Sequence, residues 1–136
     1  MEVIACVDDK NGLMFNKRRQ SRDYTVIDHI LQDSRDRCLY MTEYSAQLFT
    51  ADQSRIIVKP NFLECVGPGD YCFVEDSMLL PYESKIDRII FYRWNRKYPA
   101  DLYFDIPLTE HGWRLTEAID FPGNSHEKIT REVYCK

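Results

Sequence analysis

The densest set of chemically active side chains in the sequence is a basic run that ends next to an acidic residue. Lys17, Arg18, Arg19 and Arg22 precede the segment in which we expect the first helix to begin. The first N–H groups of a helix are unpaired, so its N-terminus attracts anions. The run therefore predicts a site for a phosphate or carboxylate group. The alternative interpretation is a solvated loop that balances nearby acids.

The three histidines, His29, His111 and His126, show no metal-ligand spacing. None belongs to an H-x-x-x-H pattern or lies beside a C-x-x-C pair, which are the usual signs of a metal site. We therefore expect no bound metal. His126 precedes Glu127 and could exchange protons near neutral pH, but its polar surroundings predict an exposed histidine in a turn.

A second basic cluster combines charge with aromatic rings, because Arg96 and Lys97 lie between Trp94 and Tyr98. Stacking together with positive charge is how proteins bind single-stranded nucleic acid. The net charge of −4 argues against nucleic acid as the main partner. A nucleic-acid-processing protein that uses this cluster and the basic run stays an alternative.

Cysteine usage and hydropathy predict a cytoplasmic protein without membrane contact. The five cysteines are odd in number and form no C-x-x-C pair, which argues against a secreted disulfide scaffold. Cys6, Cys38 and Cys72 lie in apolar runs, where we expect small buried side chains. No apolar run reaches the roughly 18 residues of a membrane span, and the segment 1–7 lacks the basic region of a signal peptide.

The elements that must position these side chains fit one domain over residues 1–136. Its length and its composition, 44% apolar and 29% charged, are ordinary for a single folded unit. The spacing of Val26, Ile27, Ile30 and Leu31 predicts a helix over about 22–34, with a shorter one over 42–49. The segment 13–22 between the first strand and that helix is expected to be a loop.

Short apolar runs closed by turn residues predict strands that are buried on both faces. An alternating pattern near the end of the chain predicts an antiparallel pair instead. The expected strands are 2–7 and 38–41, both buried, followed by 55–59, 71–74, 88–94 and a short segment at 102–104. The expected antiparallel pair is 113–119 with 129–135.

Six short segments occur in an order that matches one enzyme family along nearly the whole chain. They are 3–12, 39–45, 86–92, 101–107, 112–115 and 129–134. In these segments the chain resembles the dihydrofolate reductase family. The resemblance implies an α/β fold of three layers, α-β-α, with a mixed, mostly parallel central sheet and a C-terminal antiparallel hairpin.

The resemblance also implies a cleft and a carboxylate within it. The family places a carboxylate on the first helix, where it binds the pterin ring and helps to deliver a proton. Asp23 lies nearest to that position and Asp28 is the next candidate, although Asp23 could equally cap the helix. The residues that would line the inherited cleft are Ala5, Val26, Ile27, Met41 and Ser45.

The positions that match the family's phosphate sites carry acids in this chain. The family binds its dinucleotide at a pair of glycines after one strand and at a Gly-Arg pair after another. Here Glu75 and Asp76 stand at the first position, and Thr42 and Glu43 at the second. Only glycine lets the backbone approach a pyrophosphate closely, and like charges repel at such a site. We therefore expect no cofactor.

We expect a protein that binds a small anionic or heterocyclic ligand in the inherited cleft, and we favour binding over catalysis. One alternative is an oxidoreductase related to dihydrofolate reductase that binds NADPH through an altered site. Another is a homodimer or larger homo-oligomer, in which a paired surface replaces the cofactor cleft.

Overall fold

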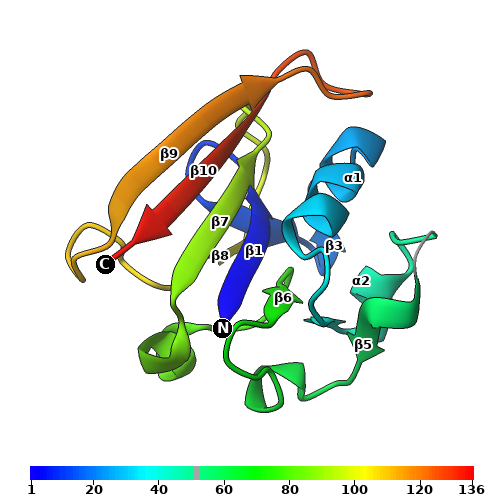
Figure 1. Ribbon diagram of the computed structural model, residues 1–136. Helices are drawn as coiled ribbons and strands as arrows, with labels where there is room; N and C mark the ends of the chain where they lie inside the picture. The colour runs from blue at the N-terminus through cyan, green and yellow to red at the C-terminus, as the bar shows by residue number, and fades with distance from the viewer. Residues whose placement is uncertain (51–52) are drawn as a thin grey trace.

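A seven-stranded mixed sheet forms the centre of the computed structural model, which describes residues 1–50 and 53–136 (Figure 1). In spatial order its strands are β5 (Ile56–Val58), β4 (Leu39–Met41), β6 (Tyr71–Phe73), β1 (Glu2–Val7), β7 (Arg88–Arg93), β10 (Ile129–Cys135) and β9 (Arg114–Phe121). The five strands from β5 to β7 are parallel to their neighbours. β10 is antiparallel to both β7 and β9, so the predicted mixed sheet and C-terminal hairpin are confirmed.

The central strands are buried because their side chains are apolar on both faces. In β1, Val3 and Ile4 are neighbours in sequence and belong to separate hydrophobic clusters on opposite sides of the sheet. In β7, Ile89 and Ile90 are divided in the same way. This arrangement explains the continuous apolar runs, since a parallel strand covered on both faces cannot alternate with polar residues.

One face of the sheet is covered by α1 (Tyr24–Asp33), which agrees with the helix expected over 22–34. Val26, Ile27 and Ile30 are its buried residues, and they pack in a cluster that also includes Ile4 of β1. α2 (Glu43–Ala46) follows β4 and is shorter than the expected helix over 42–49.

The opposite face is covered by short 3-10 helices and by connecting segments. η2 (Phe62–Glu64) contributes Phe62 to this layer, and the residue before η3 (Leu80–Lys85) contributes Leu79. A third 3-10 helix, η1 (Gln53–Arg55), leads into β5. These elements complete a three-layer arrangement around the sheet.

The expectation of a loop over 13–22 is wrong. β2 (Gly12–Phe15) and β3 (Arg18–Arg19) pair there as a hairpin, and β8 (Leu102–Tyr103) adds a third strand. The turn consists of Asn16 and Lys17, whose φ angles are 53° and 63°. Two left-handed residues give the turn that tight hairpins favour, but the usual glycine is missing, so the sequence did not reveal it.

β9 forms one edge of the central sheet and is exposed along almost its whole length. Each residue from 114 to 120 is exposed, including the apolar Leu115 and Ile119. β9 is held by its pairing with β10, which is irregular where β10 passes from Val133 to Tyr134.

None of the helices in the described part of the chain combines the length and the hydropathy that a membrane span requires.

Candidate functional site

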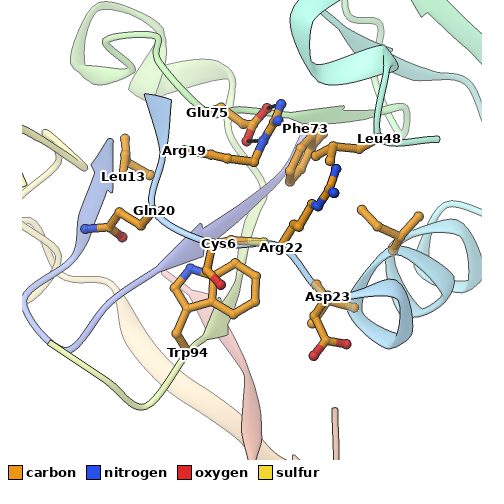
Figure 2. A pocket seen from close by; sticks show the side chains of 13 residues that line it. Cys6, Leu13, Arg19, Gln20, Arg22, Asp23, Leu48, Phe73, Glu75 and Trp94 are labelled. Atoms are coloured by element: carbon orange, nitrogen blue, oxygen red, sulfur yellow. Dashed lines mark hydrogen bonds and ion pairs between the residues drawn. The ribbon is translucent and has the colours of Figure 1, made fainter. Parts of the chain in front are cut away.

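A small pocket lies where the parallel strands β1, β6 and β7 end, which is where open α/β sheets usually bind ligands. Cys6 of β1, Phe73 of β6 and Trp94 after β7 line it together with the segment that leads into α1 (Figure 2). We call this the inner pocket. Its volume is about 10 Å³, which is room for one water molecule.

A larger hollow adjoins the inner pocket and has a volume of about 440 Å³. This outer pocket lies between the start of α1, the segment after α2 and the turn between β9 and β10. Residues 22, 23, 27 and 48 line both pockets. Tyr24, Gln47, Thr50, Asn124 and Ser125 line the outer pocket alone.

One wall of the inner pocket is a partly buried ion pair between Arg19 and Glu75. Arg19 Nε donates to Glu75 Oε2 at 2.8 Å, and Arg19 Nη2 donates to Glu75 Oε1 at 3.0 Å. The hydroxyl of Ser45 donates to Glu75 Oε1 at 2.8 Å. The guanidinium also lies 4.1 Å from the ring centre of Tyr44. The two charges therefore neutralise each other, and neither is available to a ligand without breaking the pair.

Arg22 lines the same pocket but is exposed to solvent. Figure 2 shows its side chain extending across the pocket towards Leu48 and Phe73. Within residues 1–50 and 53–136, no hydrogen bond or ion pair reaches its guanidinium. Arg22 is therefore a cation whose counter-charge can come from a ligand.

Asp23 is the N-cap of α1 and its carboxylate is buried. It accepts hydrogen bonds from the backbone N–H groups of Thr25, Asn124 and Ser125 at 2.9, 3.0 and 2.9 Å. Burial alone would raise the pKa of the Asp23 carboxyl. The hydrogen bonds from Asn124, Ser125, His126 and Thr25 outweigh it and hold that pKa well below its ordinary value. Asp23 is thus a fixed anion.

His126 connects Asp23 to two hydroxyl groups. Its Nδ1 lies 3.0 Å from Asp23 Oδ2, and its Nε2 lies 3.0 Å from Ser21 Oγ and 3.3 Å from the Tyr98 hydroxyl. Trp94 stacks on the imidazole at 4.7 Å between ring centres. The expectation of an exposed turn histidine is wrong, because only 7% of His126 is exposed.

The four basic residues of the predicted anion site have separate environments. Lys17 and Arg18 are exposed on the β2–β3 hairpin. Arg19 is paired with Glu75, and only Arg22 lines the pocket with a free guanidinium. The cluster around Trp94 is also divided, because Trp94 is buried under His126 while Arg96 and Lys97 are exposed.

The residues of the predicted cleft are only partly brought together. Val26 and Ile27 line the inner pocket, and Ser45 contacts it through Glu75. Ala5 and Met41 are fully buried in the two hydrophobic clusters.

The carboxylates singled out in the sequence also differ in position. Asp28 is exposed on α1 and lines neither pocket. Glu43 and Asp76 are exposed, whereas Glu75 is buried and lines the inner pocket.

Two further side chains help to define the chemistry of the site. Cys6 lines the inner pocket, but burial, reinforced by the charge of Glu75, raises the pKa of its thiol far above the ordinary value. A neutral thiol is a poor nucleophile and a poor metal ligand. In the part of the chain that the structure describes, no group of three or more His, Cys, Asp or Glu side chains could hold a metal ion.

Comparisons with known proteins find similarity in the fold alone. No protein-family model matches the sequence, and no curated protein is significantly similar to it. The structure is similar to that of dihydrofolate reductase from Enterococcus faecalis complexed with NADP(H) and RAB-propyl. The TM-score is 0.67, the identity is 7%, and the match covers 98% of this chain and 94% of that one. The predicted dihydrofolate reductase-like fold is therefore confirmed.

Proposed function

We propose that this protein, whose fold is that of dihydrofolate reductase, binds a small anionic ligand in the inner and outer pockets and does not use NADPH. The observation that carries the proposal is the free guanidinium of Arg22, which lies where the two pockets meet. A guanidinium binds a carboxylate or a phosphate through two parallel hydrogen bonds.

The surroundings of Arg22 define the rest of the ligand. Ile27 and Leu48 supply apolar contacts in both pockets, while Asn124 and Thr50 supply polar groups in the outer one. A volume of about 440 Å³ lies within the range of small-molecule sites. We therefore favour a compact organic anion, such as an aryl carboxylate, a short dicarboxylate or a mononucleotide.

The buried Glu75 supports the view that NADPH is not the ligand. Its carboxylate follows β6 and is tied to Arg19 and Ser45. A pyrophosphate placed there would meet a negative charge and a side chain in place of open backbone. Breaking the pair would leave the buried Glu75 carboxylate without its counter-charge, which is unfavourable. A further part of the proposal is a reducing, cytoplasmic setting, which the five free cysteines support.

Thermal unfolding with a panel of anions tests this proposal. The panel contains benzoate, glutarate, 5′-mononucleotides, folate and NADPH. A ligand at 100 times its dissociation constant stabilises the native state by about 2.7 kcal/mol. We expect at least one anion other than NADPH to raise the melting temperature, and Arg22→Gln to abolish that shift.

Arg18→Gln is the matched control, because it removes the same charge from the exposed hairpin next to the site. It should bind the anion like the unaltered protein. Three results would overturn the proposal: no stabilising anion, equal stabilisation of the Arg22→Gln variant, or micromolar NADPH binding followed by hydride transfer.

A further inference from the structure

We infer that Ser21, His126 and Asp23 form a nucleophile–base–carboxylate triad that cleaves an ester. This inference rests on the proposed function, because the anion that Arg22 binds would be part of the substrate. It goes beyond the binding activity that the sequence leads us to favour. The geometry of the three side chains carries it.

The three groups form a continuous chain of hydrogen bonds. Asp23 Oδ2 lies 3.0 Å from His126 Nδ1, and His126 Nε2 lies 3.0 Å from Ser21 Oγ. Both distances fall within the range that connects a nucleophile to its base and a base to its orienting group. Such triads occur on unrelated folds in different chain orders, so geometry and roles identify them.

Asp23 has the properties that the orienting carboxylate needs. Three backbone N–H groups fix its position, and its low pKa keeps it charged. An anion at Nδ1 holds the proton on that nitrogen, which leaves the lone pair of Nε2 to accept the hydroxyl proton of Ser21. The stacked Trp94 fixes the plane of the ring.

The position of Ser21 distinguishes this arrangement from a purely structural cap. A helix N-cap needs only the Asp23 carboxylate and the backbone N–H groups around it. In that case Nε2 of His126 could contact any polar group. Nε2 lies near two hydroxyls, Ser21 Oγ at 3.0 Å and the Tyr98 hydroxyl at 3.3 Å, and of these two only Ser21 lines the inner pocket. The next residue along the chain is Arg22, which lines the same pocket.

The chemistry that follows is ester hydrolysis in two steps. Ser21 Oγ adds to the ester carbonyl carbon while its proton moves to His126 Nε2. The bond from that carbon to the leaving oxygen then breaks, and Nε2 gives its proton to the departing alcohol. Water attacks the acyl-Ser21 carbon, passes a proton to Nε2, and the carbon–Oγ bond breaks as Nε2 returns that proton to Oγ. The products are a carboxylic acid and an alcohol.

The substrate class follows from Arg22. A half-ester of a short dicarboxylic acid carries one free carboxylate for the guanidinium and one ester group for Ser21. A neutral ester offers no partner to Arg22. We therefore expect mono-4-nitrophenyl glutarate to be hydrolysed with a higher kcat/KM than 4-nitrophenyl acetate.

The experiment measures release of 4-nitrophenol by the full chain and by Ser21→Ala and His126→Asn. Each variant should lose about 100-fold or more of kcat/KM for the half-ester. A fluorophosphonate should label Ser21, located by peptide mass spectrometry.

Ser84→Ala and His111→Asn are the controls, because both residues lie outside the two pockets. They should keep the full rate. The inference fails if Ser21→Ala hydrolyses the half-ester like the unaltered protein, if the label lies elsewhere, or if no hydrolysis occurs.

Binding of glutarate to Ser21→Ala separates this failure from that of the proposed function. If Ser21→Ala still shows the Arg22-dependent stabilisation, only the triad is rejected. If the unaltered protein shows neither stabilisation nor hydrolysis, both are rejected. A melting temperature of Ser21→Ala close to that of the unaltered protein excludes loss of fold as the cause.

Discussion

Two carboxylate–histidine pairs occur at opposite regions of this molecule, and they differ in what surrounds them. Asp23 and His126 form the buried pair, with side-chain exposures of 0% and 5%. Glu83 and His111 form the surface pair, with side-chain exposures of 14% and 37%. The nitrogen–oxygen distances are similar, 3.0 and 2.8 Å. Distance alone therefore does not distinguish a site from a surface contact.

The partners of each pair make the distinction. The buried carboxylate is held by backbone N–H groups, and its histidine reaches hydroxyls at the far nitrogen. The surface carboxylate of Glu83 is held by the side chains of Trp113, His111 and Lys136, in that order of effect, which lower its pKa to about 2. Among the described residues, no hydrogen bond reaches Nε2 of His111. In the buried pair, hydrogen-bond partners therefore hold both the carboxylate and the far nitrogen of the histidine.

The largest expected difference is in folding stability. Asp23→Asn should lower the free energy of unfolding by roughly 2–4 kcal/mol, since an NH2 group replaces Oδ2 and leaves the buried donors of Ser125 and His126 without an acceptor. Glu83→Gln should lower it less, because the amide oxygen of Gln can still accept the hydrogen bond of the Trp113 indole. Urea unfolding followed by circular dichroism measures both. An equal loss of unfolding free energy in the two variants would show that burial of Asp23 does not affect stability.

A smaller effect is expected from the glycines beside each pair. A methyl group on Gly123 would overlap the Asp23 carboxylate and lie 3.1 Å from the carbonyl oxygen of His126. Gly123→Ala should therefore cost about 1–3 kcal/mol, the range for overpacking. The space around Gly112 is open, but its φ of +84° is unfavourable for alanine, so Gly112→Ala should cost about 1 kcal/mol. Urea unfolding curves of the two variants measure which one loses more stability. A larger loss for Gly112→Ala would contradict the view that the Asp23 carboxylate is held rigidly.

The smallest expected effect is the response to acid. The pKa of Asp23 is lowered by folding, so its contribution to stability is complete above about pH 4 and is lost as pH falls through the folded value. The difference between the unaltered protein and Asp23→Asn should therefore shrink below about pH 4. His126 is the titratable side chain that touches Asp23 in the described structure. Unfolding curves from pH 7 to pH 3 test this, and a constant difference would refute it.

Much of the fold could be predicted because its signals are local. The apolar runs of β1 and β7 and the spacing of Val26, Ile27 and Ile30 depend on neighbouring residues, so the sheet and α1 were found. The β2–β3 hairpin was missed because its turn places Asn16 and Lys17 in left-handed conformations without a glycine. The residue types at these two positions do not predict such a turn.

The candidate site was only partly predictable, because its contacts join residues far apart in sequence. Arg22 and Asp23 were found beside the start of the helix. His126 was placed in an exposed turn because nothing near it shows that it contacts Ser21 and Asp23, more than 100 residues away. Glu75 was noted for its charge, but its pairing with Arg19 spans 56 residues. Whether Asp23 or Asp28 has the role that the family resemblance implies stays a prediction.

The open edge of β9 has a consequence for how this chain behaves in a crowded solution. An edge strand presents unpaired N–H and C=O groups that can template the addition of another chain. Here Arg114, Glu117 and Asp120 interrupt the apolar positions Leu115 and Ile119. Charges at such positions act as gatekeepers against self-association. The three residues thus oppose self-association at a strand whose backbone is available to a second molecule.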